Sequence, residues 1–388
     1  MILVCFLVLV FLFFGIGEYL LHGRNLKTIP VRIQVNGTRG KSSVTRLIAA
    51  GLRAGGMKVV AKVTGTKPRF IVDDDEEYPV RRLGKANIIE ELRIVRLAKA
   101  YQAEALVVEC MALVPEYQRV ESQMLIQPTH GVITNVRADH LDVMGPTVLD
   151  VARALSNTIP RRGRFFTAER GEPLKEFKKQ VPKGVEMTVV DPSTVSDDEM
   201  ERFSYIEHKE NVALALAVCS SVGVKRDDAL RGMQRSRPDS GVMRVYKIVD
   251  NGKILEVVNT LAANDPDSIG MLWGRVKDRC EKRIVLVNCR RDRADRSRQL
   301  AELVAVWEKD FTIVTGGLTK VFINRAKHLG VPAESLVDMG DELDPALVYK
   351  KVLDLVPERA LIFATGNIVG YGEKLIDYFV QKGGMVDR

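Results

Sequence analysis

A short run of small, basic and hydroxyl residues near the start of the chain has the composition of a phosphate-binding loop. The run consists of Asn36, Gly37, Thr38, Arg39, Gly40, Lys41, Ser42 and Ser43. Glycine lets the backbone turn and brings its N–H groups close to an anion. Lys41 would neutralise the β- and γ-phosphates of ATP, and the Ser42 hydroxyl would ligate Mg²⁺. The sequence therefore predicts a site whose cofactors are ATP and Mg²⁺.

The segments on either side of this loop suit the same chemistry. The apolar run 31–35 predicts a strand, and the segment 42–54 predicts a helix whose N-terminus carries a partial positive charge. The spacing is shorter than the standard Walker pattern, because Val35 stands where that pattern has glycine. An ordinary glycine turn before a helix is the alternative. The ordered succession of strand, glycines, lysine and serine favours the phosphate loop.

Three further polar residues follow other predicted strands. Glu109 ends one strand, Asn135 lies near the end of another, and His140 lies in the loop after it. Ligands of open α/β sheets bind at the carboxyl ends of strands. We therefore expect Ser42, Glu109 and His140 to hold the metal, although Mg²⁺ prefers oxygen to imidazole. Taken singly, Glu109 could be a capped strand end and His140 an ordinary loop residue.

These residues need a parallel sheet to position them, and the chain predicts one. Apolar strands alternate with helical segments, which is typical of an α/β fold with helices on both faces of the sheet. The composition changes around residues 231–241, where Arg, Pro, Asp, Ser and Gly dominate. After that point the alternation resumes. We therefore predict an ATP-binding domain over residues 23–235 and a smaller C-terminal α/β domain over residues 236–388.

The N-terminus departs from this soluble pattern. Residues 1–17 contain no charged side chain, and about 20 apolar residues are enough to cross a bilayer as a helix. A cleaved signal peptide would need basic residues before the apolar run, and there are none. Basic residues follow it instead. This predicts a transmembrane anchor over residues 1–22, with the catalytic domains in the cytoplasm and the protein in the cell membrane. A buried helix of the domain is the alternative.

The formal net charge of +8 comes from clustered arginines. A basic balance attracts polyanions in general. The chain has no basic stretch interleaved with aromatic residues and no recognition module, so we predict no nucleic-acid partner.

Several motifs carry a resemblance to a known superfamily. Residues 36–42 are similar to the ATP loop of the Mur ligases and folylpolyglutamate synthases, 134–142 to their second signature, and 208–215 to their adenine-contacting helix. Within that superfamily the chain resembles the ligase subunit of bacterial capsule poly-γ-glutamate synthases. Segments 109–118, 142–147, 262–265 and 288–293 and the apolar N-terminus carry this likeness.

The resemblance implies a Mur-ligase-like central P-loop ATPase domain and a smaller ligase domain. It also implies a role for residues outside the phosphate loop. The implied cofactor-binding residues are Asn135, Asn211, Arg244, Asn264, Asp265 and Arg290. Arg244 resembles the inter-domain arginine of the family. The implied partners are glutamate, the poly-γ-glutamate chain, the membrane, a multi-pass membrane subunit and an accessory subunit.

The implied reaction is an ATP-dependent, ADP-forming amide ligation. The γ-phosphate of ATP passes to a carboxylate, and the amino group of an incoming glutamate attacks the acyl phosphate to form a γ-amide. The transfer needs positive charge from Mg²⁺, Lys41 and a further cation. Guanidinium binds phosphate and carboxylate bidentately, so we expect Arg293 or Arg290 to supply that cation at the cleft between the domains. A solvated helix start with local ion pairs is the alternative.

The chain departs from the general Mur pattern in ways that bear on its substrate. No lysine lies between Gln102 and Lys175, so the carbamylated lysine of that pattern is missing, and Asn264 stands where the pattern has histidine. Only about 30 residues precede the ATP loop, so no domain for a UDP-sugar is expected there. Three alternatives remain open: a Mur- or folate-type ligase with another carboxylate acceptor, a membrane-tethered P-loop ATPase, and a nucleic-acid-binding protein supported by charge alone.

Overall fold

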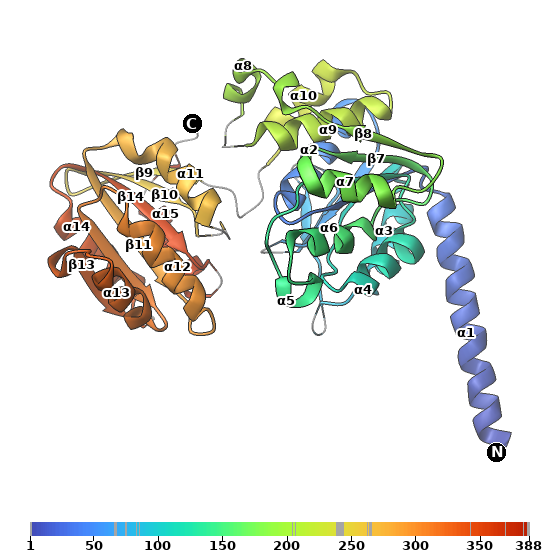
Figure 1. Ribbon diagram of the computed structural model, residues 1–388, viewed down its shortest axis with the longest axis horizontal. Helices are drawn as coiled ribbons and strands as arrows, with labels where there is room; N and C mark the ends of the chain where they lie inside the picture. The colour runs from blue at the N-terminus through green and yellow to red at the C-terminus, as the bar shows by residue number, and fades with distance from the viewer. Residues whose placement is uncertain are drawn as a thin grey trace. The chain divides into compact units, whose positions relative to one another are not determined.

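The computed structural model shows two compact units, each built on its own sheet (Figure 1). Unit 1 comprises Met1–Phe203 and Glu207–Asp239, and unit 2 comprises Ser204–Ile206 and Ser240–Arg388. The residues that the structure describes are 2–65, 68–73, 76–82, 84, 86–203, 205, 207–237, 244–261, 263, 266–341, 343–368, 370–382 and 384–385.

Unit 1 is a mainly parallel sheet with the strand order β4-β3-β2-β5-β1-β6-β7-β8. Its strands are β1 (Val31–Asn36), β2 (Val59–Val63), β3 (Arg69–Ile71), β4 (Glu77–Pro79), β5 (Ala105–Glu109), β6 (His130–Ile133), β7 (Gly163–Thr167) and β8 (Val185–Val189). Only β3 and β4 pair antiparallel to their neighbours among these strands. The predicted parallel α/β sheet is therefore confirmed.

Helices cover both faces of this sheet, so β2 and β5 are buried along their whole length. The helices and helical turns of unit 1 are α1 (Ile2–Lys27), α2 (Lys41–Ala54), α3 (Glu90–Ala100), α4 (Pro115–Val120), η1 (Glu121–Ile126), α5 (Leu141–Met144), α6 (Val148–Ser156), α7 (Gly171–Gln180), η2 (Pro192–Thr194), α8 (Asp197–Glu201), α9 (Lys209–Ser221) and α10 (Arg226–Arg235). Leu106 and Val108 of β5 pack with α3 and Ile126 of η1. Helix α2 packs against β5 as well as α9 and α10.

Unit 2 has the strand order β13-β12-β11-β14-β10-β9-β15. The strands are β9 (Arg244–Asp250), β10 (Lys253–Asn259), β11 (Lys282–Cys289), β12 (Phe311–Gly316), β13 (Leu336–Gly340), β14 (Arg359–Gly366) and β15 (Gly384–Met385). The helices and turns are α11 (Pro266–Val276), η3 (Lys277–Arg279), α12 (Ala294–Ala305), α13 (Thr319–His328), η4 (Ala333–Ser335), α14 (Pro345–Leu355) and α15 (Tyr371–Gln381).

Each face of the unit 2 sheet has its own apolar core. Helices α11, α12 and α13 pack on one face and α14 and α15 on the other. Trp273 and Trp307 stack with ring centroids 4.6 Å apart, and Phe363 of β14 meets both rings edge-on. Burial of such side chains contributes about 1.5–3 kcal/mol each. This packing holds the ends of the neighbouring strands β12, β11 and β14 in fixed positions.

Helix α1 joins unit 1 only through its last turns. Its apolar side chains from Ile2 to Leu21 are largely exposed, and it is long and apolar enough to cross a membrane by length and composition. Leu26 is buried in the same core as α3. His22 Nε2 lies 2.8 Å from the Leu125 carbonyl oxygen of η1, and Lys99 donates to Asn25 at 3.0 Å. The helix is therefore firmly attached to unit 1 at its base (Figure 1).

Candidate active site

The loop between β1 and α2 has a backbone that only glycine can adopt at two positions. Gly37 has φ +135° and Gly40 has φ +77°. A Cβ atom on Gly37 would lie 2.0 Å from Thr134 Oγ1, and one on Gly40 would lie 2.8 Å from Asn211 Oδ1. The two glycines thus let β6 and α9 pack directly against the loop.

Asn135 holds the loop in shape from the neighbouring strand. Its Oδ1 accepts hydrogen bonds from Thr38 Oγ1 at 2.7 Å and from the Arg39 N–H at 3.1 Å, and its Nδ2 donates to the Arg39 carbonyl at 3.1 Å. Asn36 Oδ1 accepts from the Gly37 N–H at 2.8 Å. These two predicted residues contact the loop itself and so define its conformation.

The start of α2 provides the donors for an anion. Gly40 precedes the helix without a side-chain cap, and the first N–H groups of a helix have no intrahelical acceptor. Lys41, Ser42 and Ser43 occupy this first turn. Lys41 Nζ donates to the Gly37 carbonyl at 2.8 Å, so its ammonium group lies over the loop. Backbone N–H groups, a helix N-terminus and an ammonium group therefore converge, as a phosphate site requires.

Glu109 and Ser42 meet at the carboxyl edge of the sheet. Val35 of β1 is paired with Glu109 of β5, which brings the end of β5 beside the phosphate loop. Glu109 Oε2 accepts from Ser42 Oγ at 2.8 Å and from the Thr64 N–H at 2.7 Å, and the side chain is only 3% exposed. Mg²⁺ in nucleotide sites usually takes one or two protein oxygens besides phosphate and water. This carboxylate–hydroxyl pair fits that requirement.

His140 lies in a different environment from this pair. It precedes α5 with φ +47°, and its Nε2 is 3.8 Å from Asp139 Oδ1. Asp139 pairs with Arg39 of the phosphate loop at 3.0 Å, so the second signature contacts the first. Within the described part of the chain, no three His, Cys, Asp or Glu side chains are grouped closely enough to hold a metal ion. The role predicted for His140 stays a prediction.

Asn211 lies at the start of α9, against the phosphate loop. Its Nδ2 donates to Glu207 Oε1 at 2.7 Å, and the His208 N–H donates to the same oxygen at 2.8 Å. Burial raises the pKa of Glu207 to about 7. The resemblance assigns Asn211 to adenine, and its contact with Gly40 brings it beside the phosphate end of the predicted site.

Two of the predicted residues of unit 2, Arg290 and Arg293, follow the carboxyl end of β11, which lies beside the ends of β12 and β14. A cavity of about 270 Å³ there is lined by Asn288, Cys289, Arg290, Arg291, Asp292, Gly316, Gly317, Asp341, Asn367, Gly370 and Tyr371. Arg290 Nε pairs with Asp292 at 2.6 Å. Arg293 is exposed at the start of α12, with its N–H donating to the Arg290 carbonyl at 3.1 Å. Arg290 therefore contributes to the cavity, and Arg293 lies at the helix start beside it.

Three predicted residues are described less fully or not at all. Arg244 begins β9, and only its backbone is described. Asn264 and Asp265 lie outside the described residues. Their predicted roles stay predictions.

Sequence reasoning missed Asn288 as a residue of this cavity. It is 2% exposed, its Nδ2 donates to the Asn367 carbonyl at 2.6 Å, and its Oδ1 has no hydrogen-bond partner. A Cβ atom on Gly316 would lie 2.5 Å from that oxygen. The available signal was an amide side chain near the end of an otherwise apolar strand.

Two mainly parallel α/β units and a phosphate loop at a strand edge define a Mur-type ligase. The Mur ligase middle domain matches residues 35–220, and the Poly-gamma-glutamate synthase CapB C-terminal domain matches residues 245–382. The bifunctional folylpolyglutamate synthase/dihydrofolate synthase of Yersinia pestis, solved with AMPPNP and Mn, has the same fold. It superposes with a TM-score of 0.67 at 14% identity, covering 94% of this chain and 92% of its own.

Two relatives identify the family more narrowly. The chain is 38% identical over 376 residues to the Capsule biosynthesis protein CapB of Bacillus anthracis, covering 95% of this chain and 80% of that protein. It is 36% identical over 391 residues to the PGA synthase CapB of Bacillus subtilis, covering 97% and 96% respectively. The chain belongs to the CapB family of poly-γ-glutamate synthases. The resemblance predicted from the sequence is thereby confirmed.

Proposed function

We propose that this chain is an ATP-dependent, ADP-forming amide ligase that joins glutamate residues through γ-amide bonds, as the catalytic subunit of a membrane-bound poly-γ-glutamate synthase. The observation that carries the proposal is CapB family membership across both halves of the chain, at residues 35–220 and 245–382. The phosphate loop with its adjoining carboxylate supplies an independent chemical argument for ATP use.

The division of labour follows from the chemistry. A carboxylate does not react with an amine until its oxygen has become a good leaving group, and phosphorylation by ATP accomplishes this. Residues 36–43 hold the phosphates, and Lys41 moves from the Gly37 carbonyl to the γ-phosphate. Ser42 and Glu109 would hold Mg²⁺, which would supply charge neutralisation when bound. The domain at 23–235 thus activates the carboxylate, and the domain at 236–388 completes the ligation.

The strand-end cavity of unit 2 is our proposed site for an anionic group of the glutamate or the growing chain. Arg290 borders the cavity and offers a guanidinium group that binds carboxylates bidentately. Arg293 is the proposed second cation, placed at the N-terminus of α12. Asn288, with its unpartnered Oδ1, can accept a hydrogen bond from the amino group of the incoming residue.

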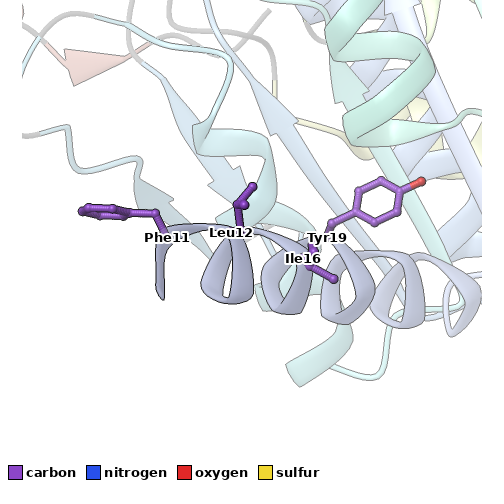
Figure 2. Close-up of a pocket in the computed structure, with 5 residues that line it drawn as sticks. Phe11, Leu12, Ile16 and Tyr19 are labelled. Carbon is purple, nitrogen blue, oxygen red and sulfur yellow. The ribbon is translucent and has the colours of Figure 1, made fainter. Parts of the chain in front are cut away.

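We also propose that α1 anchors the enzyme in the cell membrane with the ligase domains in the cytoplasm, next to a multi-pass subunit and an accessory subunit. The exposed side chains of Phe11, Leu12, Ile16 and Tyr19 lie around Gly15 on this helix (Figure 2). Small residues let transmembrane helices approach closely. Pull-down with the full chain and with a chain lacking residues 1–22 tests the contact. Equal recovery of the membrane subunit would contradict it.

The experiment that tests the function measures ADP release and polymer formation by membranes containing the full chain, with ATP, Mg²⁺ and glutamate. We expect glutamate-dependent ADP and a high-mass anionic product. Lys41→Ala should abolish both without unfolding the protein, because it removes only the cation that contacts phosphate. ADP formed equally without any amino acid would contradict the ligase. Addition of a single residue without polymer would favour a folate-type ligase.

A further inference from the structure

A buried carboxyl group that the proposed reaction does not use holds the turn that follows β5, the strand that ends at Glu109. Glu121 begins η1, a turn of π-helix, and its side chain is completely buried. Its Oε1 accepts from Gln34 Nε2 at 3.3 Å and from the Met111 N–H at 3.2 Å. Its Oε2 accepts from the Ala112 N–H at 3.1 Å. Single turns of π-helix inside α-helices occur frequently at functional sites.

These bonds hold the turn by which the chain leaves β5. The Cys110 N–H still belongs to the sheet and donates to the Val35 carbonyl at 2.9 Å. The next two N–H groups, of Met111 and Ala112, point to Glu121 instead. Glu121 therefore supplies the hydrogen-bond acceptors just beyond the point where the backbone hydrogen bonds between β1 and β5 end. Glu109 is the last residue of β5, so its backbone lies between the sheet and this turn.

The same turn is held from a second side. The ammonium group of Lys62 in β2 is buried, lies 3.4 Å from Met111 Sδ and pairs with both Glu90 and Glu91 of α3. Burial raises the pKa of Glu121 to about 8, with Glu91 adding to the effect, whereas the Met111 and Ala112 N–H groups act against it by donating to the charged form. The group is therefore mainly protonated at neutral pH, and in either form it keeps an oxygen that accepts from these two N–H groups.

We propose that Glu121 is a positioning residue for the metal site. It accepts hydrogen bonds from the Met111 and Ala112 N–H groups and so fixes the end of β5. This in turn fixes the direction of the Glu109 carboxylate toward Ser42 Oγ. The inference rests on the proposed Mg²⁺–ATP site and deepens it. Side chains that orient metal ligands typically change metal affinity about 10- to 100-fold when they are replaced.

The test measures ADP binding by the full-length protein, with and without Mg²⁺, as a binding equilibrium independent of turnover. In Glu121→Met no side-chain acceptor remains for the Met111 and Ala112 N–H groups. We expect the Mg²⁺ concentration that half-saturates the protein–ADP complex to rise at least about tenfold. ADP affinity in the absence of Mg²⁺ should change less than about twofold, because the phosphate loop is untouched.

The conservative variant Glu121→Gln provides the rescue. Its amide oxygen still accepts from the Met111 and Ala112 N–H groups, and its N–H₂ donates to Gln34 Oε1 once the Gln34 amide turns over. The Mg²⁺ requirement should return to within about threefold of the wild type. Glu176→Met is the matched control, because Glu176 is a buried carboxylate of unit 1 that pairs with Arg153 on α6.

The outcomes separate the inference from the function it rests on. A Glu121→Met protein that requires no more Mg²⁺ than Glu176→Met would overturn the positioning role. If Glu121→Met does not fold, Gln34→Met carries the test, since it removes one donor and frees the Glu121 carboxyl group to tilt. It should then raise the Mg²⁺ requirement, and an unchanged requirement would overturn the proposal. If wild-type ADP binding shows no dependence on Mg²⁺, the proposed metal site fails, and this inference fails with it.

Discussion

Replacement of Gly37 by alanine should distort the phosphate loop more severely than an equivalent change elsewhere in unit 1. Gly37 has φ +135°, and the new Cβ atom would lie 2.0 Å from Thr134 Oγ1 and 3.0 Å from the Thr134 backbone nitrogen. Gly56 is the matched control. It also has a positive φ, of +89°, but a Cβ atom there meets nothing within 4 Å. The difference between the two variants therefore combines the steric contact at Gly37 with the larger backbone cost of φ +135°, which lies further from the left-handed region that alanine can adopt.

The magnitudes can be estimated from these contacts. A left-handed conformation costs alanine about 1–2 kcal/mol, and the stiffer unfolded chain returns about 0.4–1 kcal/mol. Gly56→Ala should therefore lower the free energy of unfolding by about 1 kcal/mol. In Gly37→Ala, Thr134 Oγ1 must also leave the Arg39 carbonyl, a hydrogen bond worth about 0.5–1.5 kcal/mol. The overlap with the backbone adds about 1–3 kcal/mol, so the total is about 3–5 kcal/mol.

The assay uses the uneven distribution of tryptophan. The chain has two tryptophans, Trp273 and Trp307, and both belong to unit 2. Urea unfolding followed by circular dichroism therefore reports both units, whereas tryptophan fluorescence reports unit 2. Gly37→Ala should shift the transition of unit 1 and leave the fluorescence transition in place. It should also weaken ADP binding about 10- to 150-fold, equivalent to one lost hydrogen bond to a charged phosphate. Equal destabilisation by Gly37→Ala and Gly56→Ala would refute the reasoning.

Two further substitutions test other parts of unit 1. Burial raises the pKa of Glu207 to about 7 from its ordinary 4.5, so the folded state binds a proton that the unfolded state has released, and stability is lost as pH rises between these values. Glu207→Gln keeps the oxygen that accepts from Asn211 and His208, so it should remove roughly 3 kcal/mol of this pH dependence, measured by urea unfolding at pH 4.5 and 7.5. An unchanged pH profile would contradict this. Glu109→Gln should abolish Mg²⁺-dependent ADP formation while changing the free energy of unfolding by less than about 1.5 kcal/mol. Full activity in that variant would contradict the metal assignment.

The α/β character of both units could be predicted because their central strands are buried on both faces. Such strands read as continuous apolar runs, as β5 and β11 do. The boundaries were less predictable. Asn135, which was expected near the end of a strand, lies just beyond Ile133, where β6 ends. Its side chain and its carbonyl hold Thr38 and Arg39 instead of extending the pairing of β6. Local pattern does not show such a contact.

The site residues also fall into those that the sequence predicted and those that only the structure revealed. Ser42 and Glu109 were expected at one sheet edge, and the structure places them 2.8 Å apart because β1 and β5 are neighbours. The sequence does not single out Glu121, because a lone glutamate is usually a solvated surface residue. Its burial under the turn after β5 depends on the packing of η1 against the sheet.

The sequence by itself determined the α/β class, the phosphate loop, the apolar N-terminal helix and the family. Each of these follows from the local spacing of residues or from short motifs. Only the tertiary structure decided which of the candidate side chains meet. It joined Asn135 to the loop, Asn211 to Gly40, Glu121 to the turn after Glu109, and Asn288 to a cavity at three strand ends. The physical reason is strand order: residues far apart in the chain become neighbours only when the sheet is assembled, and local periodicity carries no record of that order.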